Sequence, residues 1–200
     1  MRITTPSRSV GRLAGLLLTL SLAACGGGGS EVTTPNDGTS GSTGSTGGTT
    51  GATTASTTGC SSADLSAAML AAVNARRATA ASCGIQGSFA AAGAVAWSAR
   101  LASAASGHAS DMAAQATLSH TGSNGSSLVN RLASAGYGWS AAAENIASGS
   151  TTVGGVVTLW MGSADHCANL MGGAYTEIGA ACASAADGTP YWVLVLARPR

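Results

Sequence analysis

The sequence predicts an α+β protein in which helices pack against a sheet. Apolar residues recur at helical spacing through the first part of the region after Cys60. Two strand-like runs near the C-terminus, Tyr175 to Ala183 and Tyr191 to Ala197, are joined by Asp187-Gly188, a dipeptide typical of a β-hairpin. All eight aromatic residues follow Cys60, so we expect one core to form within residues 60–200.

The first predicted helix begins after the N-cap residue Asp64 and continues through residues 76–81, until Cys83-Gly84 ends it. Its apolar face is formed by Leu65, Met69 and Val73. Gly93 to Trp97 is predicted to be a connection.

A second helix is predicted from Ser98 to Ala116, and a third, short one is capped by Ser126 or Ser127 and ends at Gly136. One face of the second helix carries Leu101, Ala105, His108 and Met112.

Three further elements complete the prediction. Residues 144–147 form a short strand, Val153 to Met161 is helical despite two glycines, and Ser163 caps one more turn from Asp165 to Leu170.

The first 24 residues have the features of an export signal. Arg2, Arg8 and Arg12 precede an uncharged apolar run that is too short to span a bilayer. The run ends in Leu22-Ala23-Ala24-Cys25, which resembles a bacterial lipobox and implies acylation of Cys25. The alternative is an ordinary signal peptide with an incidental cysteine. We expect a cell-envelope lipoprotein, in the outer membrane if the cell has one because no aspartate follows Cys25, or an extracellular protein.

Residues 25–59 are predicted to be a disordered tether. After Cys25 the composition is dominated by Gly, Ser and Thr, without any aromatic residue, so this segment cannot bury enough apolar surface to fold. A flexible coil of this length holds its ends roughly 30 Å apart. The expected organisation is therefore a signal peptide over residues 1–24, a tether over 25–59 and a folded domain over 60–200.

Charge and cysteine content restrict the partners and the compartment. After removal of residues 1–24, six Arg face eight Asp and Glu, a net charge of −2, so nucleic acid is not an expected partner. Apart from Cys25 there are four cysteines, an even set that fits two disulfides in an exported protein. Three pairings are open, and pairing of sequence neighbours is the simplest: Cys60 with Cys83 and Cys167 with Cys182.

Few ionisable side chains in the predicted domain can carry chemistry. His120 follows a helix, His166 lies near a helix start, and Glu144 lies between them. Two imidazoles and a carboxylate could bind a divalent cation such as zinc, or could act as a general acid/base pair. Their spacings of 24 and 22 residues match no local ligand motif.

Several motifs together resemble the CAP superfamily of cysteine-rich secretory, antigen-5 and pathogenesis-related proteins, including its bacterial SCP-like extracellular members. In chain order they are Leu118-Ser119-His120-Thr121-Gly122, Gly125, Arg131 with Ala135-Gly136-Tyr137, Glu144-Asn145-Ile146-Ala147, Trp160-Met161-x-Ser163-x-x-His166, Tyr175-Thr176-Glu177-Ile178-Gly179 and Tyr191-Trp192-Val193. The resemblance covers about residues 65–198 and implies an α-β-α sandwich.

The same resemblance implies a cavity lined by two histidines and two acidic residues. His120, Glu144 and His166 occupy three of these places, and Ser163 stands where the second acid would be. Ser163 can hydrogen-bond His166 or cap its helix. His108, on the apolar face of its helix, is expected to be a core or cavity-wall residue.

Three functions remain open from the sequence. The first is a module that binds a small ligand, a lipid or a divalent metal around His120, Glu144 and His166. The second is a metal- or acid/base-dependent hydrolase of envelope material, although a Ser-His-Asp triad is excluded because Ser163 and Asp165 are sequence neighbours of His166 and no G-x-S-x-G motif exists. The third is a structural or partner-binding surface domain, so whether the protein is an enzyme is left open.

Overall fold

A computed structural model describes Cys60 and residues 64–200. The predicted signal peptide, Cys25 and the tether therefore lie outside the described residues. The sheet has four strands in the order β3-β5-β6-β4, with β3 parallel to β5 and the other pairs antiparallel. The strands are β3 (Ala96–Trp97), β5 (Glu177–Ser184), β6 (Pro190–Pro199) and β4 (Trp139–Ser148).

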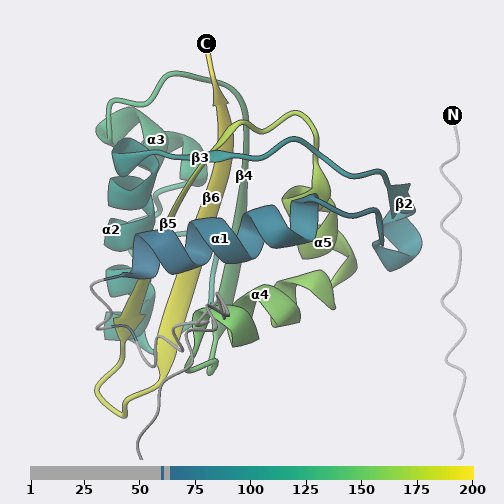
Figure 1. Ribbon diagram of the computed structural model, residues 1–200. Helices are drawn as coiled ribbons and strands as arrows, with labels where there is room; N and C mark the ends of the chain where they lie inside the picture. The colour runs from purple at the N-terminus through teal and green to yellow at the C-terminus, as the bar shows by residue number, and fades with distance from the viewer. Residues whose placement is uncertain (1–59, 61–63) are drawn as a thin grey trace, which may run out of the picture. The chain divides into compact units, whose positions relative to one another are not determined.

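Helices cover both faces of this sheet (Figure 1). One layer contains α2 (Ala99–Gln115) and α3 (Leu128–Ser134), and the other contains α1 (Leu65–Arg77), α4 (Val153–Met161) and α5 (Ala164–Met171). Among the described residues, no helix is long and apolar enough to cross a membrane.

The central strand β6 shows why the sheet needs two helical layers. Trp192, Leu194 and Leu196 belong to the core beneath α1 and α4. Val193 and Val195, which alternate with them, belong to the core beneath α2. Because successive side chains of a strand point to opposite faces, an apolar run such as this one must be covered on both sides. The predicted α-β-α sandwich is confirmed.

Most predicted elements are present, with two differences. The first helix ends at Arg77, earlier than predicted, because the chain then forms a two-stranded hairpin of β1 (Ala81–Ser82) and β2 (Ser88–Phe89) around the 3-10 turn η1 (Gly84–Gln86). Gly84 and Gly87 hold positive φ angles there, which favours glycine. The segment predicted as a connection supplies the edge strand β3, which is too short to show a periodic pattern.

Gly179 allows the α2 layer to approach the sheet closely. A Cβ atom at this position of β5 would collide with the backbone of Leu101 and Ala102 in α2. Glycine is therefore required by close backbone approach in the centre of the sheet.

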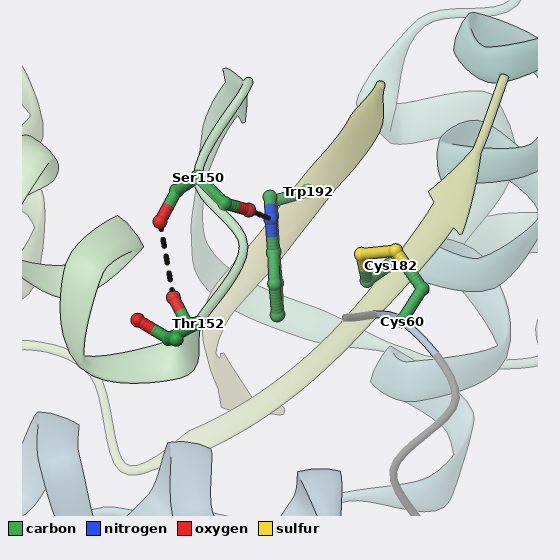
Figure 2. Close-up of a disulfide and its surroundings, with 5 residues drawn as sticks. All are labelled: Cys60, Ser150, Thr152, Cys182 and Trp192. Atoms are coloured by element: carbon green, nitrogen blue, oxygen red, sulfur yellow. Dashed lines mark hydrogen bonds between the residues drawn. A yellow bond between two sulfur atoms is a disulfide. The ribbon is translucent and has the colours of Figure 1, made fainter. Parts of the chain in front are cut away.

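One disulfide links Cys60 to Cys182 (Figure 2) and the other links Cys83 to Cys167, with Cα–Cα distances of 4.9 and 5.4 Å. The pairing of sequence neighbours was wrong, because the fold brings distant segments together. Cys182 lies on β5 and is joined to Cys60, which comes before α1 in the chain, whereas Cys83 follows β1 and packs against α5. The closed loops, with separations of 122 and 84 residues, are long, so each crosslink restricts the unfolded chain strongly.

Arg77 joins α1 to the chain around α5. Its guanidinium is fully buried and donates hydrogen bonds of 2.7–3.2 Å only to backbone carbonyls, those of Gly93, Leu170, Gly172 and Tyr175. The bonds to Leu170 and Gly172 satisfy carbonyls at the C-terminus of α5, which the helix itself leaves without partners.

Candidate functional site

The site is organised by two neighbouring residues of the edge strand β4. Glu144 pairs in register with Val195 and Asn145 with Leu194, so the two side chains point to opposite faces of the sheet. Glu144 faces the α2 and α3 layer, and Asn145 faces α5. These adjacent residues can therefore hold two segments that come from different layers of the fold.

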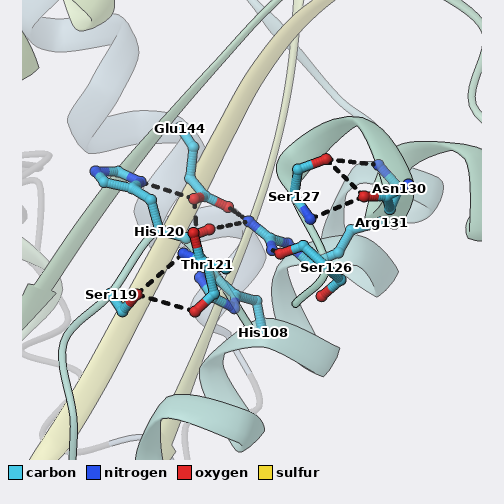
Figure 3. A network of polar contacts seen from close by, with 9 residues as sticks. All are labelled: His108, Ser119, His120, Thr121, Ser126, Ser127, Asn130, Arg131 and Glu144. Atoms are coloured by element: carbon cyan, nitrogen blue, oxygen red, sulfur yellow. Dashed lines mark hydrogen bonds and ion pairs between the residues drawn. The ribbon is translucent and has the colours of Figure 1, made fainter. Parts of the chain in front are cut away.

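Glu144 has a buried side chain, 4% exposed, and three partners surround its carboxylate (Figure 3). Arg131 Nη2 lies 2.7 Å from Oε2 and His120 Nδ1 lies 2.9 Å from Oε1. His108 Nε2 is 3.8 Å from the same Oε1. A buried carboxylate requires such compensation.

The loop that carries His120 is fixed by its own turn and by Arg131. The hydroxyl of Ser119 accepts a 3.0 Å bond from the Thr121 amide and donates a 2.9 Å bond to the Thr121 carbonyl. Arg131 Nη2 donates to the His120 carbonyl at 3.1 Å, and Nη1 donates to Ser126 at 2.9 Å. One guanidinium therefore fixes both the loop and the carboxylate that the loop contacts.

Arg131 is placed in turn by the helix α3. Ser127 caps this short helix in a capping box with Asn130, which satisfies amides at the N-terminus. Ser127, one of the two residues predicted to be the cap, is thus the one used.

The contact with Glu144 fixes the protonation pattern of His120. A carboxylate paired with a guanidinium only accepts hydrogen bonds, so Nδ1 of His120 must be the donor. In the neutral ring Nε2 then carries the lone pair, and it points away from Glu144 (Figure 3). The side chain of His120 is 58% exposed, so this nitrogen belongs to an accessible imidazole.

His166 is positioned through the other face of β4. Asn145 is fully buried and donates from Nδ2 to the His166 carbonyl at 3.0 Å, while Asn169 donates to Asn145 Oδ1 at 2.9 Å. His166 itself is half-buried. Burial lowers the pKa of His166 and the charge of His120 lowers it further, whereas Asp165 acts in the opposite direction.

His108 lies in the core, as its position on the apolar face of α2 predicted. It is 1% exposed, and its pKa is lowered mainly by burial and further by the charge of Arg131. Glu144, the backbone of Ser119 and Asp111 favour its protonated form. Neither ring nitrogen makes a hydrogen bond of good geometry.

The predicted three-ligand metal site does not fit this arrangement. Both oxygens of Glu144 are engaged, one by His120 and the other by Arg131. Across residues 64–200 and Cys60, no group of three or more His, Cys, Asp or Glu side chains is placed to hold a metal ion. Glu144 orients a histidine in this structure and is not available as a ligand.

Ser163 is the N-cap residue of α5, but its side chain makes no capping hydrogen bond.

Two residues have a larger part in the site than the sequence indicated. Arg131 and Asn145 were recognised only as members of motifs, because residue types alone do not show that one pairs with Glu144 and the other anchors α5. The available signal in the sequence was Asn145, a polar residue directly next to the candidate Glu144.

Comparisons with known proteins agree with the fold. The family model of CAP, the cysteine-rich secretory protein family, matches residues 70–196. No curated protein matches the chain.

Several solved structures are similar to the chain. An outer surface protein from Borrelia burgdorferi is 20% identical with a TM-score of 0.50, covering 55% of this chain and 80% of its own, which supports the fold alone. An extracellular protein with an SCP domain from Bacillus anthracis is 26% identical with a TM-score of 0.48 over 54% of this chain. The match covers 34% of that protein, about a third of its length. NaASP2, solved with Zn²⁺, is 14% identical with a TM-score of 0.47, covering 68% of this chain and 80% of its own.

Proposed function

Because the chain belongs to the cysteine-rich secretory protein (CAP) family, we propose that it is an exported CAP-domain protein that binds a small ligand at the surface formed by His120 and His166. Glu144 and Asn145 act as positioning residues beneath this surface. The observation that carries the proposal is the pair of Glu144 and His120, in which a buried carboxylate fixes an exposed imidazole.

A purely structural role accounts less well for this geometry. A histidine needed only to neutralise Glu144 would be redundant, because Arg131 already pairs with that carboxylate at 2.7 Å. The exposed ring of His120 gains orientation from the contact, and preorganised polar groups of this kind reduce the ordering cost of binding. The Nε2 lone pair of His120 fits a ligand that donates a hydrogen bond.

A divalent metal is the alternative occupant of the same surface. This chain would offer it the imidazoles of His120 and His166, with Glu144 holding the first ring from behind, as carboxylates often do for metal-bound histidines. Two protein ligands are fewer than the three or four of most zinc sites, so we expect any zinc binding to be weak.

Calorimetric titration with Zn²⁺ and NMR screening of small polar molecules test the proposal with one set of variants. His120→Ala and His166→Ala should each abolish the binding that the wild type shows. Gln115→Ala, a control on the exposed C-terminal end of α2, should leave it unchanged. Equal binding in all four proteins, or no binding to any probe, would contradict the proposal.

A second candidate is acid/base hydrolysis of envelope material. The specific observation in its favour is again the 2.9 Å contact, since a histidine oriented by a carboxylate can take a proton from water through Nε2. Turnover of peptide, ester or glycan substrates that falls at least 100-fold in His120→Ala would support it. Rates equal to buffer on all three classes would remove it for those substrates.

We also propose that acylated Cys25 anchors the protein to the membrane, with residues 26–59 as the tether. The support is the lipobox-like segment Leu22 to Cys25 and the two disulfides, which belong to an oxidising compartment. Mass spectrometry should find a lipid on Cys25, and cell fractionation should recover the wild type in the membrane fraction. The variant Cys25→Ser should be released, and its retention with the wild type would contradict anchoring.

A further inference from the structure

A groove lies between α2 and α3, and neither His120 nor His166 is among the residues that line it. Its volume is about 340 Å³, at the small end of the range for ligand sites. Small residues on the two helices leave it open, namely Ala104 and Gly107 on α2 and Ser134 and Ala135 on α3. The turn at one end is fixed to α2, because Asp111 accepts hydrogen bonds from the amide and the hydroxyl of Ser123.

Two buried polar side chains line this groove without using all their hydrogen-bonding capacity. His108, 1% exposed, makes no hydrogen bond of good geometry at either ring nitrogen, although its Nε2 lies 3.8 Å from Glu144 Oε1. Arg131 is 9% exposed, and its Nε makes none either, although its other nitrogens bind Glu144 and two carbonyls. Buried polar atoms without partners are uncommon in folded proteins and require an explanation.

The charges of the lining indicate what kind of ligand fits. Arg131 is already neutralised by Glu144, and the Asp111 carboxylate also lines the groove, so an anion gains little. Burial lowers the pKa of His108, which keeps its ring neutral at neutral pH, with one donor and one acceptor. Ser126, Asn130 and Ser134 add further groups that donate and accept.

We propose that the groove between α2 and α3 is a second binding site, which takes a small neutral polyhydroxylated molecule of monosaccharide size. Each hydroxyl group of such a ligand both donates and accepts a hydrogen bond, which matches a guanidinium Nε and a neutral imidazole together. The methyl groups and glycine of the walls suit the C–H face of a sugar ring.

NMR titration of the ¹⁵N-labelled protein with D-glucose and N-acetyl-D-glucosamine tests this site, with sodium phosphate as the anionic probe. At least one sugar should cause saturable shifts of the Arg131 Nε–H signal and of the Gly107 and Ser134 amides, and phosphate should not. The absence of saturable shifts with both sugars, or binding of phosphate alone, would overturn the proposal.

Two blocking variants and a matched control localise the effect. Gly107→Leu extends a side chain into the groove from a position where an added Cβ meets nothing within 4 Å, and Ser134→Leu does so from the facing helix. Each should weaken sugar binding at least 10-fold. Ser106→Leu adds the same side chain at an exposed neighbour that does not line the groove, and should bind as the wild type does. Wild-type affinity in both blocking variants would place the sugar elsewhere and overturn the proposal.

Discussion

The two arginines that are buried within residues 64–200 serve different ends. Arg77 donates only to backbone carbonyls, four of them, and none of its nitrogens lacks a partner. Arg131 pairs with a buried carboxylate, fixes the loop that carries His120, and keeps one nitrogen free. The first region has its polar groups saturated, whereas the second has a buried centre from which an exposed imidazole and an open groove both extend.

This difference separates stability from function within one fold. A saturated polar centre has no capacity for a ligand and serves to lock helices together. A buried polar centre that has an exposed partner and polar atoms without partners can still form hydrogen bonds to a ligand, which is typical of binding sites. We therefore expect changes around Arg77 to affect unfolding alone, and changes around Arg131 to affect both unfolding and binding.

Arg77→Met should have the largest effect on stability. Methionine fills much of the volume but leaves one buried and three part-buried carbonyls without their donor, and each unsatisfied buried group costs about 1–3 kcal/mol. We expect a loss of about 4 kcal/mol or more in the free energy of unfolding, measured by urea denaturation with the disulfides intact. A loss below about 1 kcal/mol would contradict the structural role of Arg77.

Arg131→Met should cost about 3 kcal/mol, because it leaves the buried carboxylate of Glu144 without its guanidinium. Unlike the loss of stability in Arg77→Met, this loss should be partly reversed by a second substitution. The double variant Arg131→Met with Glu144→Leu removes both charges and should regain about 2 kcal/mol, since apolar pairs often replace buried ion pairs without loss. It should not regain any binding that depends on His120. A double variant as unstable as the sum of the single ones would show that the ion pair is not the main contribution.

Acidification should weaken the Arg131 region more than the Arg77 region. Burial lowers the pKa of His108 and of His166 below the unfolded value of 6.5. For a lowered histidine pKa, the stability is fully present above pH 6.5 and is lost as the pH falls towards the folded pKa, because the unfolded chain binds more protons.

Urea denaturation at pH 7.5 and 5 measures this loss. His108→Gln should lose less stability than the wild type between the two values, because glutamine cannot take up a proton in this buried position, which Glu144, Arg131 and Asp111 face. An equal loss in both proteins would exclude His108 as a source of the pH dependence.

The sequence predicted the layers of the fold better than the connections between them, although the strand predicted over residues 144–147 is in fact the longer β4, Trp139–Ser148. The apolar face of α2, with Leu101, Ala105, His108 and Met112, is buried as its spacing required, and the hairpin of β5 and β6 turns at Asp187-Gly188. These features follow from local periodicity and turn chemistry. Disulfide pairing, the end of α1 and the edge strand β3 depend on contacts between distant segments, which local patterns do not contain.

The sequence selected the candidate site residues but did not predict the contacts between them. His120, Glu144 and His166 were selected because ionisable residues are few, and the structure places His120 on Glu144. The sequence could not predict that Glu144 orients His120, because this role depends on Arg131 occupying the second carboxylate oxygen of Glu144. Asn145 holds the segment of His166 from the opposite face of the sheet, and this role follows only from the register of β4.

The ring tautomer of His120 tests the central claim most directly, namely that Glu144 presents an oriented imidazole to solvent. Long-range ¹H–¹⁵N NMR reports which ring nitrogen carries the proton. At a pH where the ring is neutral we expect a proton on Nδ1 and an unprotonated, accessible Nε2, with loss of this preference in Glu144→Leu. A neutral ring protonated on Nε2 in the wild type would contradict the claim.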